Sequence, residues 1–304
     1  MSLNPSNSPR STVQKMLLVC VCVAMGVLAL DQWSKAWASA HLASPTHPLM
    51  VRAGGTRTIE QQFASLGVTP EELSAKIAAR QLWLYRPLRT EEFALERGHT
   101  DAPRQLLWAG NSVGPAPRGL YLTLQDGNAN VANIIRAKLR KEHLDPQDFW
   151  VMDSPIDRGD RSLALGHVAA LLQREISVMT PGVELVYAEN PGAAWGALRD
   201  LSDGFRTSLF AVIALIAIIL LFWLVRSTPT LVVAICAGSV IGGALGNLLD
   251  RLRFSVVIDF ILHAVGQWRW PVYNIADVGI SAGGFILCIY LVTGARVRAA
   301  SPTS

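Results

Sequence analysis

The stretch GGALGNLLDRLRFSVVIDFI, residues 242–261, begins like a membrane helix and then breaks that pattern. Small and apolar residues give way to Asp250 and Arg251, after which an apolar run resumes and carries Asp259 inside it. The segment SVVIDFIL, residues 255–262, is short and rich in β-branched residues, which predicts a strand or an interfacial loop. An ionisable side chain near membrane depth needs a partner or a function. Asp259 is therefore a candidate functional residue.

The following segment supplies a second acid. In WPVYNIADVGISAGG, residues 270–284, Pro271 favours a helix that starts near Asn274 and continues into an apolar span. Asp277 would then lie one turn inside the helix, on the same face as Asn274. A simple return of the chain would bring Asp259 and Asp277 together. Two carboxyl groups in a weakly polar site cannot both ionise easily, so the pair would act as one base and one acid, as in aspartic proteases.

Composition places this pair in a membrane protein. The chain of 304 residues is 51% apolar and only 16% charged, and its apolar residues form long runs. Four runs can cross a hydrocarbon core of about 30 Å, namely residues 16–34, 207–225, 230–249 and 275–294. Five basic residues beside these runs would lie in the cytoplasm together with both termini, namely Arg10, Lys15, Arg226, Arg296 and Arg298. The two acids would then lie on the extracytoplasmic side.

The N-terminal run has a second interpretation. Lys15, the apolar run and ASA at residues 38–40 match the parts of a cleavable signal peptide. The run is long for a signal peptide, and cleavage would remove Asp31 and Lys35. A retained first span is therefore expected.

The region between the first two spans, residues 41–180, is polar and long enough to form a domain of its own. Its patterns predict helices and a strand, with helices over residues 69–85, 128–144 and 161–176 and a strand over residues 118–126. The second of these helices is basic and amphipathic. This predicts a small α/β module, and we hypothesise that it gates the substrate or contacts the membrane interface.

Several classes of site are not expected. All four cysteines lie in apolar runs, so the polar region has no disulfide framework and no cysteine metal site. The six histidines show no metal-ligand spacing. The formal charge of +4 is small and scattered, which argues against nucleic-acid binding. We expect neither a metal nor a cofactor.

Four blocks in register resemble the lipoprotein signal peptidase (signal peptidase II) family, namely DQWSKAW (31–37), ENPGAAWGAL (189–198), residues 242–261 and WPVYNIADVGISAG (270–283). The resemblance implies a multi-pass aspartic endopeptidase of the bacterial inner membrane. Such enzymes remove the signal peptide of a prolipoprotein by cutting before a cysteine that carries diacylglycerol. The resemblance also implies a membrane α-helical fold, a four-transmembrane-helix bundle with a small outer-face β platform. This chain would add the inserted extracytoplasmic α/β module.

Matched residue by residue, the catalytic pair of the family falls on Asp259 and Asp277. Substrate-binding or supporting positions of the family fall on eight further residues, namely Asp31, Lys35, Asn190, Gly192, Asn247, Asp250, Arg251 and Asn274. From the sequence alone, Asp31 and Lys35 also fit an interfacial i,i+4 ion pair whose lysine extends toward water. Asp250 fits a structural contact to a neighbouring loop, and Gly192 fits an ordinary turn.

The expected domains follow the spans, namely the N-terminal tail with the first transmembrane helix (1–40), the inserted module (41–180), the outer-face β platform (181–206) and transmembrane helices two to four with the catalytic segment (207–304). The expected partners are diacylglyceryl-modified prolipoproteins and membrane lipid. A monomer is expected.

Two other functions remain open at this point. GNSVG at residues 110–114 fits the G-x-S-x-G motif of serine hydrolases, but Pro115 and Pro117 follow where that motif needs a helix. A catalytically diverged paralogue could instead use its insertion to bind a partner. Retention of both acids argues against the paralogue, because a membrane anchor gains nothing from Asp277.

Overall fold

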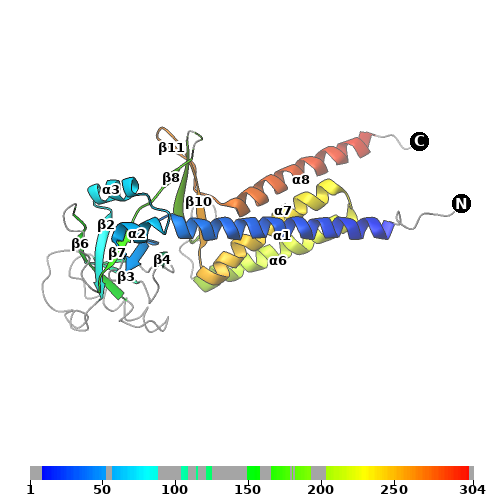
Figure 1. The fold of residues 1–304 in the computed structure, drawn as a ribbon. Helices are drawn as coiled ribbons and strands as arrows, with labels where there is room; N and C mark the ends of the chain where they lie inside the picture. The colour runs from blue at the N-terminus through cyan, green and yellow to red at the C-terminus, as the bar shows by residue number, and fades with distance from the viewer. Residues whose placement is uncertain are drawn as a thin grey trace. The chain divides into compact units, whose positions relative to one another are not determined.

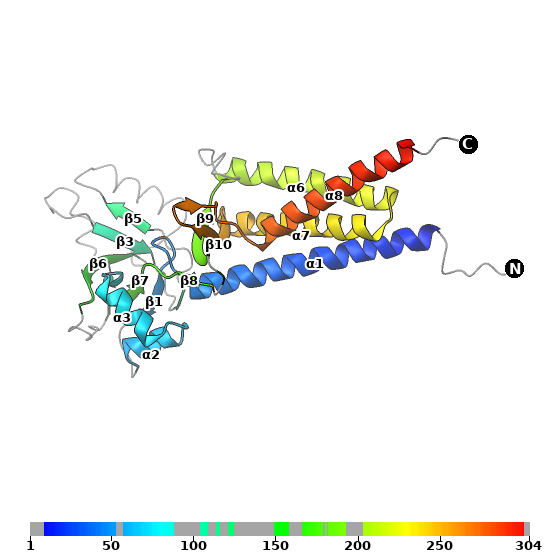
Figure 2. The same ribbon diagram turned by 90° about the horizontal axis from the view of Figure 1, so that it is seen from above.

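The computed structural model describes residues 9–52, 57–87, 104–108, 114–115, 121–124, 149–157, 166–178, 180, 182–192 and 203–300. The chain forms two compact units. The first consists of Met1–Trp37, Val178–Glu184 and Ala188–Ser304, and the second of Ala38–Ser177 and Leu185–Tyr187. In Figures 1 and 2 the first unit is recognised by its long helices, and the second by a larger sheet with two short helices.

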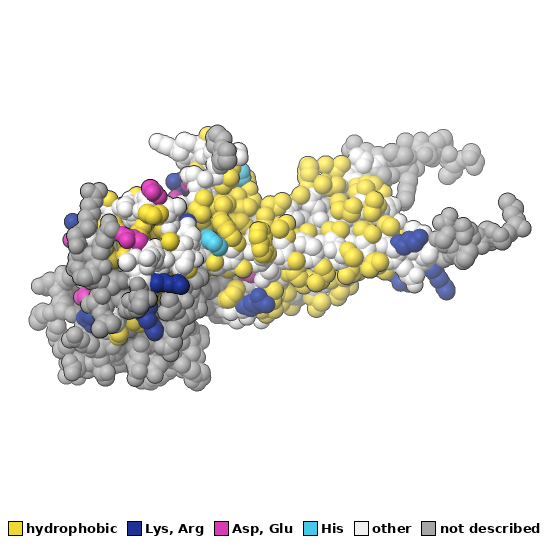
Figure 3. Space-filling view, viewed as in Figure 1, with side chains coloured by type: hydrophobic (Ala, Val, Ile, Leu, Met, Phe, Trp, Pro, Cys, Tyr) yellow, Lys and Arg dark blue, Asp and Glu magenta, His cyan; other side chains and the backbone are white. Residues whose placement is uncertain are grey.

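Four long helices dominate the first unit, namely α1 (Pro9–His41), α6 (Asp203–Ser227), α7 (Leu231–Phe254) and α8 (Ile275–Ala300). Within the described residues, these four helices are long and apolar enough to cross a membrane. Each covers one of the four predicted spans, except that α7 begins one residue after the predicted start at residue 230. The prediction of four helices long and apolar enough to cross a membrane is therefore confirmed. Large apolar side chains such as Ile213, Leu220 and Trp223 are exposed on α6. The space-filling view shows the hydrophobic surface along the helices (Figure 3), as expected for helices that face lipid.

Helix α7 packs against α6 and α8, and its glycines let other helices approach closely. A Cβ atom on Gly238 or Gly242 would lie 2.5 Å from a backbone oxygen of α1. A Cβ atom on Gly243 would collide with the backbone oxygen of Ala276 in α8. Small residues at such crossings allow close backbone packing in membranes. This packing brings α1 and α8 against α7, where their polar ends meet.

A smaller sheet has four strands in the order β11-β10-β9-β8. Its strands are β8 (Ile176–Ser177), β9 (Val183–Asn190), β10 (Val257–Val265) and β11 (Trp268–Arg269). Helix α7 ends at Phe254, and the next residue, Ser255, takes a left-handed conformation (φ 62°) and donates its N–H to the oxygen of Arg251. The chain then enters β10, the strand expected in the segment around Asp259. A bridge between Ile261 and Tyr273 ties β10 to the segment that precedes α8.

The second unit is built on an antiparallel seven-stranded sheet with the order β4-β1-β7-β2-β6-β3-β5. Its elements are β1 (Leu49–Arg52), α2 (Ile59–Ala64), α3 (Pro70–Ala78), β2 (Leu82–Pro87), β3 (Arg104–Trp108), β4 (Gly114–Pro115), β5 (Tyr121–Leu124), β6 (Phe149–Pro155) and β7 (Val168–Leu171). Both helices bury apolar side chains with those of the sheet, such as Phe63 of α2 and Leu73 of α3. Alternate residues of β1 supply two clusters, because Leu49 and Val51 belong to one and Met50 to the other.

The structure corrects two of the helices predicted in this unit. Residues 161–176 do not form a helix where they are described, because Val168–Leu171 is strand β7, paired with β1 and β2. All four residues of β7 are buried, and a strand buried on both faces shows the same apolar run as a helix. The helix predicted over residues 69–85 ends at Ala78, and β2 begins at Leu82. The strand predicted over residues 118–126 contains β5, whereas residues 128–144 lie outside the described residues.

The two ends of the inserted region meet within the second unit. Ala43 and Arg174 form an antiparallel bridge with reciprocal backbone hydrogen bonds of 3.2 and 3.1 Å. The buried Arg174 guanidinium pairs with Glu72 at 2.8 Å and donates to the backbone oxygens of His41 and Gly67. The entry and the exit of the insertion are therefore held side by side.

Candidate active site

Asp259 lies on β10 and is 3% exposed. Its Oδ1 accepts a hydrogen bond from Asn274 Nδ2 at 2.7 Å, and its Oδ2 accepts one from Asn190 Nδ2 at 3.1 Å. Asn190 is the last residue of β9. Both carboxyl oxygens therefore face amide donors from other segments of the chain.

Asp277 lies in the first turn of α8 and forms a reciprocal cap with Asn274. The Asn274 Oδ1 accepts from the backbone N–H of Asp277 at 3.0 Å, and Asp277 Oδ2 accepts from the backbone N–H of Asn274 at 3.2 Å. This is the capping-box arrangement, in which the two side chains satisfy each other's backbone donors. The second carboxyl oxygen, Oδ1, accepts from Asn247 Nδ2 at 2.8 Å.

Asn274 joins the two acids. Its side chain is fully buried, and it donates to Asp259 while it accepts from the backbone of Asp277. The same amide also donates to Asn247 Oδ1 at 3.1 Å and to the oxygen of Ile258 at 3.2 Å. The structure thus brings both acids that the sequence singled out to one buried asparagine.

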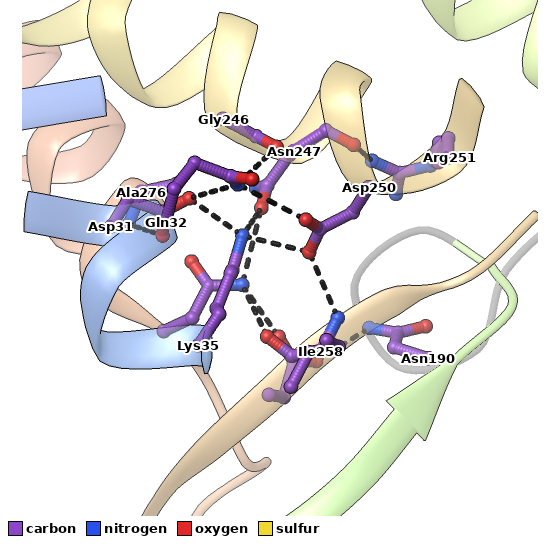
Figure 4. A network of polar contacts seen from close by, with 12 residues as sticks. Asp31, Gln32, Lys35, Asn190, Gly246, Asn247, Asp250, Arg251, Ile258 and Ala276 are labelled. Carbon is purple, nitrogen blue, oxygen red and sulfur yellow. Dashed lines mark hydrogen bonds and ion pairs between the residues drawn. The ribbon is translucent and has the colours of Figure 1, made fainter. Parts of the chain in front are cut away.

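Lys35 is the centre of a buried ionic cluster on the α7 side of this asparagine. Its Nζ lies 2.8 Å from Asp31 Oδ2, 3.0 Å from Asp250 Oδ2 and 3.0 Å from Asn247 Oδ1. Lys35 is 2% exposed, and the two carboxylates are 0% and 1% exposed. Figure 4 shows the lysine amine pointing into this network. The interpretation of Lys35 as extending toward water is therefore wrong, because the lysine turns inward to two buried carboxylates.

The two buried carboxylates also bind backbone donors. Asp31 Oδ1 accepts from the N–H of Ala276 at 2.9 Å, and Asp250 Oδ2 accepts from the N–H of Ile258 at 3.1 Å. The structural contact expected for Asp250 is thus present, with β10 as its partner (Figure 4).

Arg251 and Gly192 shape the other side of the site. Arg251 Nη2 donates to the oxygen of Gly192 at 3.0 Å, and its Nη1 donates to the oxygen of Asn247 at 3.2 Å. The guanidinium lies 4.0 Å from the ring centroid of Phe210 on α6, a cation–π contact. Gly192 donates its N–H to Asn190 Oδ1 at 3.0 Å, which closes the kind of turn that asparagine favours. These contacts orient the Asn190 amide toward Asp259.

Sequence reasoning missed Gln32 and Gly246. The Gln32 amide donates to Asp31 Oδ2 at 3.2 Å, to Asp250 Oδ1 at 3.1 Å and to the oxygen of Gly246 at 3.3 Å. A Cβ atom on Gly246 would collide with the Asp31 carboxylate. The one signal in the sequence that could have indicated Gln32 as a site residue was its position directly after Asp31. Nothing in the local sequence indicates which side chain needs the space at Gly246.

The pKa of Asp259 is raised to about 7, mainly by burial and in addition by the nearby charge of Asp277. The hydrogen bonds from Asn190 and Asn274 and the charge of Lys35 act in the opposite direction. A carboxyl group with this pKa exchanges its proton near neutral pH, as a general acid or base requires. Within the described residues, no three His, Cys, Asp or Glu side chains are grouped to hold a metal ion.

Comparison with known proteins places this arrangement in a family. The family model described as "Signal peptidase (SPase) II" matches residues 156–293. The lipoprotein signal peptidase of Methylocella silvestris is 37% identical over 129 residues, which cover 42% of this chain and 75% of the relative. That of Oleidesulfovibrio alaskensis is 41% identical over 109 residues, 35% of this chain and 69% of the relative. That of Syntrophus aciditrophicus is 37% identical over 123 residues, 40% of this chain and 76% of the relative. Because the match spans most of each relative, the chain belongs to the signal peptidase (SPase) II family.

Proposed function

We propose that this protein removes signal peptides from prolipoproteins in a bacterial membrane, and that it does so as an aspartic endopeptidase. We further propose that it cuts before a cysteine that carries diacylglycerol. The observation that carries the aspartic mechanism is the contact of one buried asparagine, Asn274, with both Asp259 and Asp277. Names of the relatives support the substrate class, because each is a lipoprotein signal peptidase.

The surroundings of the two acids suggest how they divide the work. Asp277 lies in the first turn of α8, where the helix dipole and two N–H donors stabilise a negative charge. Asp259 is buried and has a pKa of about 7, which favours its protonated form below that pH. We therefore assign Asp277 as the base and Asp259 as the acid.

In the first step, Asp277 takes a proton from a water molecule while the water oxygen attacks the scissile carbonyl carbon. Asp259 gives its proton to the carbonyl oxygen, which yields a neutral gem-diol. In the second step, protonated Asp277 gives its proton to the departing amide nitrogen, and Asp259 recovers a proton from a gem-diol hydroxyl. The carbon–nitrogen bond breaks, and both acids return to their starting states.

The position of the acids along the helices suits a substrate held by a membrane. Asp277 lies in the first turn of α8, and Asp250, the ionic partner of Lys35, lies in the last turns of α7. The site is therefore at one end of the spans, where a lipid-anchored cysteine would meet water. We propose that this is the extracytoplasmic end, with both termini in the cytoplasm. The start of α1 and the end of α8 lie at the other end of the helices (Figure 1). The exposed Arg10 lies in the first turn of α1 and the exposed Arg226 in the last turn of α6, which supports this orientation.

The remaining residues that match the family are proposed to support the acids. Asn190, Asn247 and Asn274 donate to carboxylate oxygens of the pair. Arg251 and Gly192 hold the Asn190 turn. Asp31, Lys35 and Asp250 form the buried ionic cluster behind the pair. The alternative of a non-catalytic paralogue is not favoured, because the relatives are peptidases and both acids are held in one hydrogen-bond network.

The test is a cleavage assay with Asp259→Asn and Asp277→Asn, purified in detergent. Each change leaves the shape of the side chain but removes a proton-transfer group, so each should abolish cleavage of a diacylglyceryl-modified precursor. A monodisperse gel-filtration peak and an unchanged melting temperature would show that the variants are folded. Full turnover by either variant would disprove the assignment of Asp259 and Asp277 as the catalytic pair.

A second arm of the assay tests the substrate class. The wild-type protein is given the same precursor with and without the diacylglyceryl group. We expect cleavage of the modified precursor only. Equal rates on both forms would refute the requirement for lipid while leaving the aspartic mechanism intact.

A further inference from the structure

A second pair of buried carboxylates mirrors the catalytic pair. Asp31 binds the backbone N–H of Ala276 at 2.9 Å, and Asp250 binds the backbone N–H of Ile258 at 3.1 Å. Ala276 directly precedes Asp277, and Ile258 directly precedes Asp259. Each proposed catalytic acid thus directly follows a residue whose backbone N–H is bound by a buried carboxylate.

One ammonium group ties these two anchors together. Lys35 Nζ lies 2.8 Å from Asp31 Oδ2 and 3.0 Å from Asp250 Oδ2. Asp250 uses the same oxygen for Lys35 and for Ile258, whereas Asp31 uses its other oxygen for Ala276. Figure 4 shows Lys35 between the two carboxylates, which come from α1 and α7.

The same ammonium reaches the catalytic pair by a second route. Lys35 Nζ donates to Asn247 Oδ1 at 3.0 Å, and Asn247 Nδ2 donates to Asp277 Oδ1 at 2.8 Å. The Asn247 amide is thereby held in one orientation, with its oxygen toward the lysine and its nitrogen toward Asp277. If Lys35 is absent, the Asn247 oxygen loses its charged donor, and this orientation depends on the contacts with Asp277 and Asn274 alone.

We propose that Lys35, Asp31 and Asp250 act as a positioning unit, in which one buried ammonium fixes two carboxylate anchors and thereby sets the separation of Asp259 and Asp277. This inference rests on the proposed aspartic mechanism. None of the three is a catalytic residue, because their contacts are to backbone N–H groups, to one another and to Asn247 and Gln32.

The physical basis is the repulsion that Lys35 prevents. Two ionised carboxylates in a buried space repel each other strongly unless a cation lies between them. Without the ammonium, at least one carboxylate would turn away or take up a proton, and a backbone N–H would lose its acceptor. A buried donor without a partner is costly, so the strand or the helix end would shift to find one. Misplacement of a catalytic group by about 1 Å can slow a reaction about 100-fold.

The test compares Lys35→Met with wild type by measuring kcat and KM separately on a diacylglyceryl-modified precursor. Methionine keeps an unbranched side chain of similar length but has no charge. We expect kcat to fall about 100-fold, because the acids are misplaced, while KM stays within about threefold, because Lys35 is not proposed to contact the substrate. The matched control is Arg253→Met, which removes an exposed cation and its long hydrogen bond of 3.4 Å to Gln32 Oε1. This control should leave both constants unchanged.

A rescue experiment separates positioning from a general structural role. In the double variant Lys35→Met with Asp31→Asn, the repulsion is gone, and the amide oxygen can still accept from Ala276. We expect this variant to recover about tenfold in kcat over Lys35→Met, since part of the anchor is restored. If Lys35→Met does not fold, the triple variant with Lys35→Met, Asp31→Asn and Asp250→Asn is measured instead. It leaves no unpaired charge in this buried cluster. Its kcat should fall below that of wild type while its KM stays unchanged.

Three results would overturn the inference, namely an unchanged kcat in Lys35→Met, a double variant no more active than the single one, or a triple variant with wild-type kcat. Asp277→Asn is assayed beside them to keep the two proposals apart. Loss of turnover in Asp277→Asn with full turnover in the Lys35 variants would leave the peptidase mechanism standing and remove the positioning unit. Full turnover in Asp277→Asn would instead remove the mechanism itself.

Discussion

Raising the pH through 7 should switch the peptidase off, because the proposed acid loses its proton. Burial, followed by the charge of Asp277, raises the pKa of Asp259 to about 7. Below this pH the side chain holds its proton and can donate it, and above it the protonated fraction falls. At one unit above the pKa only about a tenth of the molecules are protonated, so kcat/KM should fall about tenfold for each pH unit above 7.

The substitution Asn190→Ala turns this expectation into a sharp test. The Asn190 amide donates to Asp259 Oδ2 at 3.1 Å and acts to lower the pKa of that carboxyl group. A hydrogen bond to a charged group contributes about 1.5–3 kcal/mol, and one pKa unit corresponds to about 1.4 kcal/mol. Because the protonated form also accepts part of this bond, the loss of Asn190 should raise the pKa of Asp259 by about one unit.

The assay is the pH profile of kcat/KM for a fluorescent lipid-modified precursor in detergent, measured from pH 5 to pH 9. The alkaline limb should move up by about one unit in Asn190→Ala, even though the absolute rate also falls. The other charged groups that act on Asp259 come from α8, α1 and α7, namely Asp277, Lys35 and Arg251, and they are unchanged in this variant. Because the acids are coupled, the limb is assigned to the pair rather than to one residue.

An alkaline limb that stays in place, or that moves to lower pH, would refute this reasoning. The first result would mean that the limb does not report the pair of acids to which Asp259 belongs. The second would mean that the Asn190 amide favours the neutral carboxyl. Gln173→Ala serves as the control, because it removes an exposed amide hydrogen bond to Gln81 within the second unit and should leave the whole profile unchanged.

Two further predictions concern packing and the insertion. Gly246→Ala should destabilise the protein by about 1–3 kcal/mol, because its Cβ atom would displace the Asp31 carboxylate. The control Gly284→Ala has no atom within 4 Å of its Cβ and should not lower the melting temperature in detergent, because alanine favours a helix more than glycine does. Equal melting temperatures for the two variants would contradict this. Replacing residues 44–173 by an Asn-Gly turn should keep the fold of the first unit, because Ala43 and Arg174 already pair. If the insertion gates the substrate, the rates of cleavage of a panel of lipid-modified precursors should change. Unchanged rates for all of these precursors would reject gating.

The helices and the identity of the two acids could be read from local patterns. Long apolar runs predict membrane spans because the hydrocarbon core sets their length, and α1, α6, α7 and α8 correspond to the expected runs. Pro271 and Asn274 correctly predicted the start of α8, which begins at Ile275. The membrane spans and the helix start depend only on residues that are neighbours in the sequence, so a single sequence is enough to predict them. The role of each acid in catalysis remains a prediction until the variants are assayed.

In the inserted region, local sequence patterns did not predict all of the secondary structure correctly. Val168–Leu171 is apolar at every position, which suits a buried helix as well as a central strand. Only the pairing with β1 and β2 selects the strand, and those partners lie far away in sequence. The basic segment at residues 128–144 and the GNSVG motif at residues 110–114, apart from Gly114, lie outside the described residues, so their interpretation stays a prediction.

What the sequence determined was the number of spans, the order of the polar blocks and the pair of acids, since each follows from hydrophobic length or residue type. The tertiary structure alone decided where Lys35 points. A lysine at the end of a span can extend to water or turn inward, and the inward direction is stabilised by carboxylates on two different helices, α1 and α7. The sequence also did not predict that Asp250 binds the backbone N–H of Ile258 or that Asp31 binds that of Ala276. A backbone N–H is present in every residue but proline, so no residue type reveals which distant carboxylate it will bind.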